Sequence, residues 1–424
     1  MAILLGAIGD DVTGSTDVAL MLSKHGMSVV QFIGLPPAGS VVRESQAAVV
    51  ALKSRTAPVA QAVGESLAAC DWLLAQGAQQ IFFKYCSTFD STEKGNIGPV
   101  AEALLEHLAA GVTVYCPAFP ENRRTVFNGH LFVGTDLLSE SSMRHHPLTP
   151  MSDSNLVRFL GKQVRRSESV GLIDYATVER GPTAIRSRLQ ELAGGQCRHV
   201  VVDALTNPHL FAIGEACADL KLLTGGSGVA MGLPKNFRRA GLLADATGAA
   251  ALPRLAGGTA VLAGSCSAAT RRQVARMSAR CPSICIDPYE LAAGKMAVED
   301  IARRAIKRLA GGPVLIYSTA EPERVAAVQA QLGREAAGRL IEQAMGELAL
   351  RLRQAGVSKF IIAGGETSGA VMAALKVGSL RIGPEIAPGV PWTSTTEEPR
   401  LCLALKSGNF GDDDFFEKAA RMLP

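Results

Sequence analysis

Short apolar runs alternate with amphipathic stretches along almost the whole chain, and this alternation restricts its fold more than any other feature. The runs of strand length lie at residues 3–8, 28–33, 81–85, 112–116, 199–202, 260–263, 283–286, 314–318, 359–363 and 401–405. Helical spacing of apolar residues occurs at 16–24, 59–75, 98–109, 183–192, 268–279, 298–309 and 323–354. Strands that alternate with helices favour sheets with helices packed on their faces. We therefore predict an α/β fold whose sheets are mostly parallel and flanked by helices.

The chain has 424 residues, which is long enough for two or three domains. Residues 242–258 are rich in small side chains, contain Pro253 and precede a new strand. We therefore predict two domains, residues 1–245 and 257–424, each a mostly parallel sheet flanked by helices. Ligands of such sheets bind at the carboxyl ends of the strands. We expect the active site in the cleft between the two domains.

Charge and cysteine content exclude several classes of protein. The net charge is only +4, and no basic run is interleaved with aromatic residues, so nucleic acid is not an expected partner. The nine cysteines are scattered without a CxxC pair, which is typical of reduced thiols in a cytoplasmic protein. No stretch is long and apolar enough for a membrane span, and the first residues read as a strand rather than a signal peptide.

Two polar motifs follow strands in the N-terminal half. Asp10 and Asp11 stand between Gly9 and Thr13 at the predicted start of a helix, where they either cap the helix or bind substrate hydroxyl groups. Lys84, Asp90 and Ser91 lie in a stretch rich in hydroxyl groups. A cation and a carboxylate in one loop suit a small polyhydroxy anion, although Asx and Ser/Thr turns would use the same residues.

Two further motifs are less specific. The adjacent Arg123 and Arg124 could hold a carboxylate or phosphate, or simply be solvated. The glycine run at residues 224–228 follows no clear strand and lacks the spacing of a dinucleotide fingerprint. It is the only support for a dinucleotide-dependent oxidoreductase. No GxxxxGK[ST] motif occurs, which excludes a Walker P-loop.

Three glycine- and serine-rich turns follow strands in the C-terminal half. Their candidate ligand-binding residues are Ser265 in the first turn, Gly364, Gly365, Glu366 and Thr367 in the second, and Gly408 and Gly411 in the third. Glycine lets the backbone approach a ligand closely, and successive N–H groups form a nest for an anion. Three such turns at matching positions in one domain predict a nucleotide site.

Together these motifs resemble the four-carbon acid sugar kinase family. The matching stretches are GDDVTG at 9–14, FDST at 89–92, GSCSAAT at 264–270, AGGETSG at 363–369 and KSGNFG at 406–411. The resemblance covers essentially the whole chain. The stretches KYCSTFDSTEKGNIGPV, PAFPENRRTVFNGHLFVG and HPLTPMSDSNL resemble the 3-oxo-tetronate 4-kinase branch rather than the D-threonate or D-erythronate branches.

The resemblance implies ATP-dependent phosphorylation of the 4-hydroxyl group of a 3-oxo-tetronate. It also implies Mg²⁺ as a cofactor, but it does not indicate which residues bind the metal. It places Asp10, Asp11, Lys84 and Asp90 in the sugar-acid site. The three C-terminal turns would bind ATP. The catalytic base is left among Asp10, Asp11, Asp90 and Asp203; we rank Asp203 lowest and prefer Asp11, which lies further into its turn. A homodimer is one assembly that the sequence allows.

Overall fold

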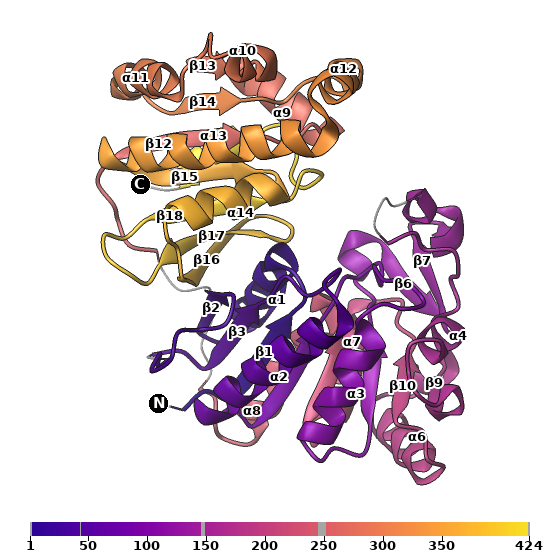
Figure 1. Cartoon of the computed structure of the whole chain (residues 1–424). Helices are drawn as coiled ribbons and strands as arrows, with labels where there is room; N and C mark the ends of the chain where they lie inside the picture. Colours follow the sequence, from indigo (N-terminus) through magenta and orange to yellow (C-terminus); the bar gives the residue numbers. More distant parts are fainter. Residues whose placement is uncertain (1, 43, 146–148, 245–251, 423–424) are drawn as a thin grey trace. The chain divides into compact units, whose positions relative to one another are not determined.

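The structure is a computed structural model that describes residues 2–42, 44–145, 149–244 and 252–422. The chain divides into two compact units, Met1–Ala249 and Ala250–Pro424 (Figure 1). Residue 245, the predicted end of the N-terminal domain, lies outside the described residues. Within the described residues, no helix has both the length and the apolar character needed to cross a bilayer.

The N-terminal unit is built on a parallel sheet with the strand order β2-β3-β1-β4-β11-β5-β10-β9. The strands are β1 (Leu5–Gly9), β2 (Val29–Ile33), β3 (Ala47–Ala51), β4 (Gln80–Lys84), β5 (Thr113–Cys116), β9 (Val170–Ile173), β10 (His199–Val202) and β11 (Leu222–Gly225). A small antiparallel sheet consists of β6 (Arg124–Phe127), β7 (His130–Val133) and β8 (Asp136–Leu137).

Helices cover both faces of this sheet. They are α1 (Val12–Lys24), α2 (Val59–Ala75), α3 (Ile97–His107), α4 (Leu156–Gly161), α5 (Tyr175–Val178), α6 (Pro182–Gly194), α7 (Asn207–Ala216) and α8 (Leu233–Arg239). Helices α2 and α3 contact each other on one face (Figure 1), and α1 packs against β1, β2 and β3. The central strand β1 is fully buried, so its carboxyl end is a fixed point from which the following residues are positioned.

The C-terminal unit has a second sheet with the order β13-β14-β12-β15-β18-β17-β16. Its strands are β12 (Gly258–Ala263), β13 (Ser283–Cys285), β14 (Val314–Tyr317), β15 (Val357–Ala363), β16 (Ser379–Ala387), β17 (Val390–Thr395) and β18 (Cys402–Lys406). Strands β13, β14, β12, β15 and β18 pair with one another in parallel. Strands β16 and β17 form an antiparallel hairpin, and β17 pairs antiparallel with β18.

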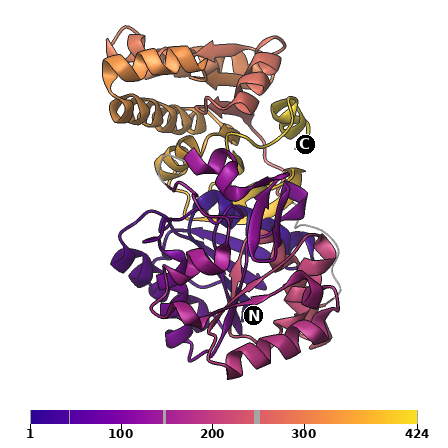
Figure 2. The same ribbon diagram turned by 90° about the vertical axis from the view of Figure 1, so that its right-hand side faces the viewer.

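The helices of this unit also lie on two faces. They are α9 (Ala268–Ser278), α10 (Pro288–Ala292), α11 (Val298–Arg308), α12 (Pro322–Leu332), α13 (Arg334–Gln354), α14 (Gly365–Ala374) and α15 (Phe415–Met422). Helices α11, α13 and α14 form one layer, while α9 and α15 contact each other in the other. In Figure 2, the yellow α15 beside the C label lies on the opposite side of the unit from the orange α13. Trp392 is fully buried in the core on the α15 side, where its Nε1 donates to Ala419 O at 3.1 Å.

The structure confirms the α/β class and the mostly parallel sheets flanked by helices. Strands β3, β9, β16 and β17 were not predicted, and two further details of the sequence prediction were wrong. The helix expected over 323–354 is two helices, because Gly333 adopts a φ of +82° that ends α12. The glycine run at 224–228 does follow a strand, β11.

Candidate active site

Acidic and basic residues follow three adjacent strands of the N-terminal unit. Strand β1 pairs in parallel with β3 and β4, and the register sets Gly9 opposite both Ala51 and Lys84. The chain therefore leaves these strands at one edge of the sheet. Asp10 and Asp11 follow β1, Arg55 follows β3, and Lys84 ends β4.

Arg55 holds the carboxylates of this edge together. Its Nε and Nη2 donate to the two carboxylate oxygens of Asp10 at 2.9 Å each, and Nη2 also donates to Asp11 Oδ1 at 2.7 Å. Its Nη1 lies 3.7 Å from Asp90 Oδ2. We call Asp10, Asp11, Arg55 and Asp90 the Asp–Arg cluster. The fork of the guanidinium group matches carboxylates in two-point contacts, so the cluster is geometrically specific.

The two adjacent aspartates differ in environment. The side chain of Asp10 is 5% exposed and that of Asp11 is 27% exposed. Burial raises the pKa of Asp10 despite the opposing effect of Arg55. Burial also acts to raise the pKa of Asp11, but Arg55 and Lys84 outweigh it and the pKa is lowered. Of these two aspartates, Asp11 therefore has the lowered pKa and the more exposed side chain.

Asp11 is also the N-cap of α1. Its Oδ1 accepts from Gly14 N at 3.2 Å, and its Oδ2 accepts from Thr13 Oγ1 at 2.8 Å. A Cβ on Gly14 would lie 2.4 Å from Asp11 Oδ1 and 2.6 Å from Lys84 Nζ. Gly14 thus leaves the space in which the buried ammonium group of Lys84 approaches the carboxylate. The side chain of Asp11 therefore both caps α1 and belongs to the Asp–Arg cluster.

The loop after β4 carries Asp90 and Ser91, and both are buried. Thr88 Oγ1 donates to Asp90 Oδ1 at 2.5 Å, and Gln163 Nε2 donates to Ser91 Oγ at 2.9 Å. Asn96 connects this loop to the loop that carries Arg55, since its Nδ2 donates to the carbonyl oxygens of residues 54 and 57 at 2.7 and 2.8 Å. The two loops are therefore held in one arrangement by side chains outside the cluster.

The two arginines follow β5, and Asp203 follows β10. Arg123 is exposed, with a φ of +59° after a short 3-10 turn, and Arg124 starts β6, where its guanidinium donates to the carbonyl of Asn122. Asp203 accepts from the backbone N–H groups of Asn128, Gly129 and Tyr175 at 2.6 to 2.9 Å. Asp203 therefore anchors the turn of the β6–β7 hairpin.

The glycine run at residues 224–228 has a packing role. Added Cβ atoms on Gly225, Gly226 and Gly228 would lie 2.4 to 2.7 Å from the carbonyl oxygens of residues 116, 117 and 118. These glycines let the end of β11 pack directly on the backbone that follows β5. The run therefore offers no support for a dinucleotide site.

In the C-terminal unit, the three glycine- and serine-rich turns meet at the ends of three adjacent parallel strands. The register sets Ala263 of β12 opposite Ala363 of β15, and Ala363 opposite Lys406 of β18. Backbone hydrogen bonds between neighbouring strands continue into the turns. Gly264 N donates to Ala363 O at 3.0 Å, and Gly364 N donates to Lys406 O at 2.9 Å. The three turns are thus neighbours at one edge of the sheet.

The glycines of these turns allow close contact between them. A Cβ on Gly264 would lie 2.2 Å from Thr367 Oγ1, and one on Gly408 would lie 2.5 Å from Ser265 Oγ. Gly364 has a φ of +129°, which only glycine adopts readily. Gly411, with a φ of +76°, packs against the ring of Phe415.

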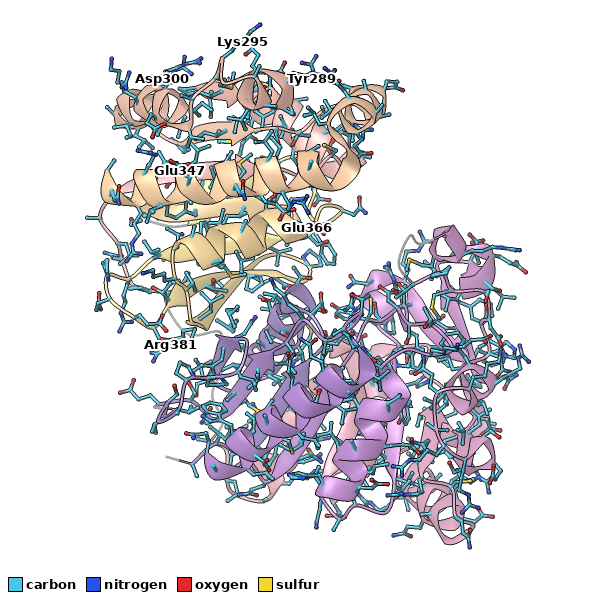
Figure 3. All side chains as sticks on the ribbon, in the orientation of Figure 1. Tyr289, Lys295, Asp300, Glu347, Glu366 and Arg381 are labelled. Atoms are coloured by element: carbon cyan, nitrogen blue, oxygen red, sulfur yellow. The ribbon has the colours of Figure 1, made fainter. Side chains whose placement is uncertain are left out.

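Gly365 and Glu366 differ from the other turn residues because both are exposed. They occupy the first turn of α14, and no atom lies within 4 Å of the position of a Cβ on Gly365. Figure 3 labels Glu366 at this end of α14. A helix N-terminus with open space above a glycine is a suitable place for an anion.

Sequence reasoning missed two residues that organise these sites, Arg55 and Lys406. Arg55 follows a strand that was not predicted, so no motif drew attention to it. Lys406 was noted within KSGNFG, but the pattern did not show that its ammonium group turns back under the third turn.

Comparison with known proteins agrees with this division of the chain. Residues 5–233 match the model of a sugar-binding N-terminal domain, and residues 260–416 match that of a nucleotide-binding C-terminal domain. Proteins named 3-oxo-tetronate kinase from Burkholderia multivorans and Pseudomonas fluorescens are 56% and 57% identical over 420 and 422 residues, which cover 99% of this chain and 97% of each relative. The chain belongs to the four-carbon acid sugar kinase family. A solved structure of a Haemophilus influenzae protein of family DUF1537 matches with 43% identity and a TM-score of 0.85, over 99% of this chain and 100% of that protein.

Membership of the family agrees with the observed positions of the motifs. The stretch GDDVTG forms the end of β1 and the start of α1, and it supplies two carboxylates of the Asp–Arg cluster. The stretches GSCSAAT, AGGETSG and KSGNFG form the three neighbouring turns of the C-terminal unit. The polar residues of each family domain therefore gather at one edge of its own sheet.

Proposed function

We propose that this chain is a kinase that transfers the γ-phosphoryl group of ATP to the 4-hydroxyl group of 3-oxo-tetronate, giving 3-oxo-tetronate 4-phosphate and ADP. One observation carries the proposal. Three glycine- and serine-rich turns converge in the C-terminal unit, while the N-terminal unit gathers carboxylates and cations at a sheet edge. The names of the relatives support the substrate. Because the second substrate is ATP, we place the activity in the cytoplasm.

In this proposal, the N-terminal unit binds the sugar acid. Lys84 attracts the substrate carboxylate, and Asp90 accepts hydrogen bonds from substrate hydroxyl groups. The oxygen of the 4-hydroxyl group attacks the γ-phosphorus, and Asp11 accepts the proton that this hydroxyl group loses. The bond from the γ-phosphorus to the bridging oxygen breaks in the same displacement, and ADP leaves with the electron pair. Arg55 positions Asp11 and keeps it ionised through the 2.7 Å contact.

The C-terminal unit binds the nucleotide. Backbone N–H groups of the three turns and the N-terminus of α14 hold the phosphates, since a chain without a P-loop needs other donors. Mg²⁺ generally takes one or two protein carboxylates together with phosphate oxygens. The exposed Glu366, in the first turn of α14, is a carboxylate of the right kind beside the second turn. Bound Mg²⁺ would neutralise charge on the phosphates.

A coupled assay of ADP release with the purified full chain tests the proposal. The acceptors are 3-oxo-tetronate, D-threonate and D-erythronate, with an acceptor-free reaction and a reaction with NAD⁺ or NADP⁺ in place of ATP as controls. We expect ADP release that depends on 3-oxo-tetronate, with a kcat/KM at least about 10-fold higher than for the other acids. Phosphorus NMR should show the ester at C4.

The outcomes separate the alternatives. Preferred turnover of D-threonate or D-erythronate would assign the chain to another branch of the family. Hydride transfer without ADP release would indicate an oxidoreductase. No ADP release with any acceptor would refute the kinase.

A further inference from the structure

Lys406 is a fully buried lysine at the end of β18. Its Nζ donates to Thr270 Oγ1 at 3.0 Å, to Ser407 O at 3.0 Å and to Gly408 O at 2.8 Å. An ammonium group has three donors, so these contacts use all of them. In the part of the chain that the structure describes, no carboxylate forms an ion pair with Lys406, and burial alone shifts its pKa. A buried cation without a counter-ion is costly and calls for an explanation.

The contacts of Lys406 converge on one carbonyl group of the third turn. Gly408 O accepts from Lys406 Nζ at 2.8 Å, from Thr270 Oγ1 at 2.9 Å and from Ser267 Oγ. In a trans peptide, the C=O and the following N–H point in opposite directions. Three donors on Gly408 O therefore fix the direction of the N–H group of Asn409.

We infer that Lys406 is a positioning residue for nucleotide phosphates: it fixes the Gly408 carbonyl, directs the Asn409 N–H to the opposite side of the peptide for a phosphate oxygen, and supplies positive charge behind the turn. The inference rests on the proposed function, because it takes the third turn as part of the nucleotide site. The ligand class is the polyphosphate of a nucleoside triphosphate. The missing counter-ion of Lys406 is then the ligand itself.

The electrostatics of the site support this role. A buried charge acts through protein of low dielectric and is screened by salt less than a surface charge. Burial lowers the pKa of Lys406 to about 8, so the ammonium form still predominates at pH 7. The ring of Phe415 lies 6.0 Å from Nζ and closes the side of the ammonium group toward α15. Nearby phosphates would stabilise the charged form further.

Calorimetry on the full-length chain with ATP and with adenosine tests the inference. We expect Lys406→Met to weaken ATP binding about 10- to 100-fold, the usual effect of losing hydrogen bonds to a charged group. Adenosine, which has no phosphates, should bind within about 2-fold of wild type, and so should 3-oxo-tetronate. The matched control is Lys418→Met, which removes an exposed lysine of α15 in the same unit and should change none of these affinities.

Thr270→Val tests the same network if Lys406→Met does not fold. It removes one donor to Gly408 O and one acceptor of Lys406, and we expect ATP to bind about 3- to 10-fold more weakly with adenosine unchanged. Equal losses for ATP and adenosine, or ATP affinity within 2-fold of wild type in a folded variant, would overturn the inference. Failure of the wild-type chain to bind ATP would instead refute the proposed function.

Discussion

At the scale of single residues, adjacent aspartates acquire different chemistry from their surroundings. Both oxygens of Asp10 contact Arg55 and the side chain is almost completely buried, which suits a fixed counter-ion. Asp11 is more exposed and has a lowered pKa. An acceptor for a substrate proton has to be reachable, and we therefore propose Asp11 rather than Asp10 as the base.

Replacing Asp11 tests its role as a base. We expect Asp11→Asn to lower kcat by roughly 10²–10⁴, the range for loss of a positioned base. The affinity for the sugar acid should change far less, because asparagine keeps the shape and one hydrogen-bond acceptor. Steady-state kinetics and calorimetry measure the two effects. Asp71→Asn, at an exposed carboxylate of α2, is the control. A kcat within a few-fold of wild type would leave Asp11 as a helix cap only.

Arg55 acts to lower the pKa of Asp11, and this predicts a pH effect. In Arg55→Gln the cation is lost, so the pKa of Asp11 should rise. Activity requires ionised Asp11, so the acidic limb of the kcat/KM profile should move to higher pH. We also expect a loss of about 10- to 100-fold near neutral pH. Arg158→Gln, at an exposed arginine paired with Asp153, should leave the profile in place. An unshifted acidic limb in Arg55→Gln would contradict this role.

At the scale of elements, the sequence predicted strands best where apolar runs were bounded by polar residues. Strand β3, at 47–51, was missed for two reasons. All five residues are buried, so polar and apolar residues do not alternate, and three of the five are alanine, which has a low strand propensity. Without β3, Arg55 had no place at a sheet edge. The three C-terminal turns were predicted because glycine and serine directly follow clear strands. Their mutual contacts depend on strand order, which local sequence does not encode.

The two glycines at the start of the second C-terminal turn have different roles. Gly364 shapes the turn, and Gly365 is proposed to contact the ATP phosphates. Gly364 has a positive φ and a Cβ position 2.9 Å from Thr367 Oγ1, so a side chain there should distort the turn itself. Gly365 has a helical conformation and free space. The residue of this turn that needs a positive φ is therefore Gly364 and not Gly365.

Gly365→Val should remain folded and lose ATP binding, because the added methyl groups occupy the space proposed for phosphate. Binding of the sugar acid should be unchanged. Calorimetry with each ligand and a thermal melt measure these properties. Gly338→Val, on the exposed side of α13 where a Cβ has room, is the control. ATP affinity equal to wild type in folded Gly365→Val would remove this turn from the nucleotide site.

The packing of α7 against the segment after β11 predicts a stability effect. A Cβ on Gly214 would lie 2.7 Å from the Cα of Gly232, a backbone atom that cannot move aside easily. We expect Gly214→Ala to lower the free energy of unfolding by about 1–3 kcal/mol, the usual cost of overpacking. In contrast, a Cβ on Gly64 of α2 would have no neighbouring atom within 4 Å. Gly64→Ala should therefore raise the free energy of unfolding by about 1 kcal/mol. Urea denaturation measures both, and equal effects would refute the packing argument.

At the scale of the whole molecule, each unit has its own sheet, helices on two faces and a buried interior. A unit of this kind can keep its fold when the connection between the units is cut. Residues 242–258 contain the small-residue stretch that the sequence marked as the connection. We therefore predict that limited proteolysis of the full chain cuts within 242–258 and leaves two protected fragments.

The proteolysis experiment also tests whether ligands act on the whole molecule. We expect slower cleavage within 242–258 when ATP and 3-oxo-tetronate are present together than with either alone, because transfer requires the γ-phosphate and the 4-hydroxyl group to meet. Mass spectrometry identifies the cut sites, and each purified fragment can be checked for secondary structure by circular dichroism. Adenosine with D-erythronate is the control pair. Cuts that lie only elsewhere, with unbroken protection through 242–258, would contradict two separately folded units, whereas ligand-independent cleavage there would support the units but not their coupling.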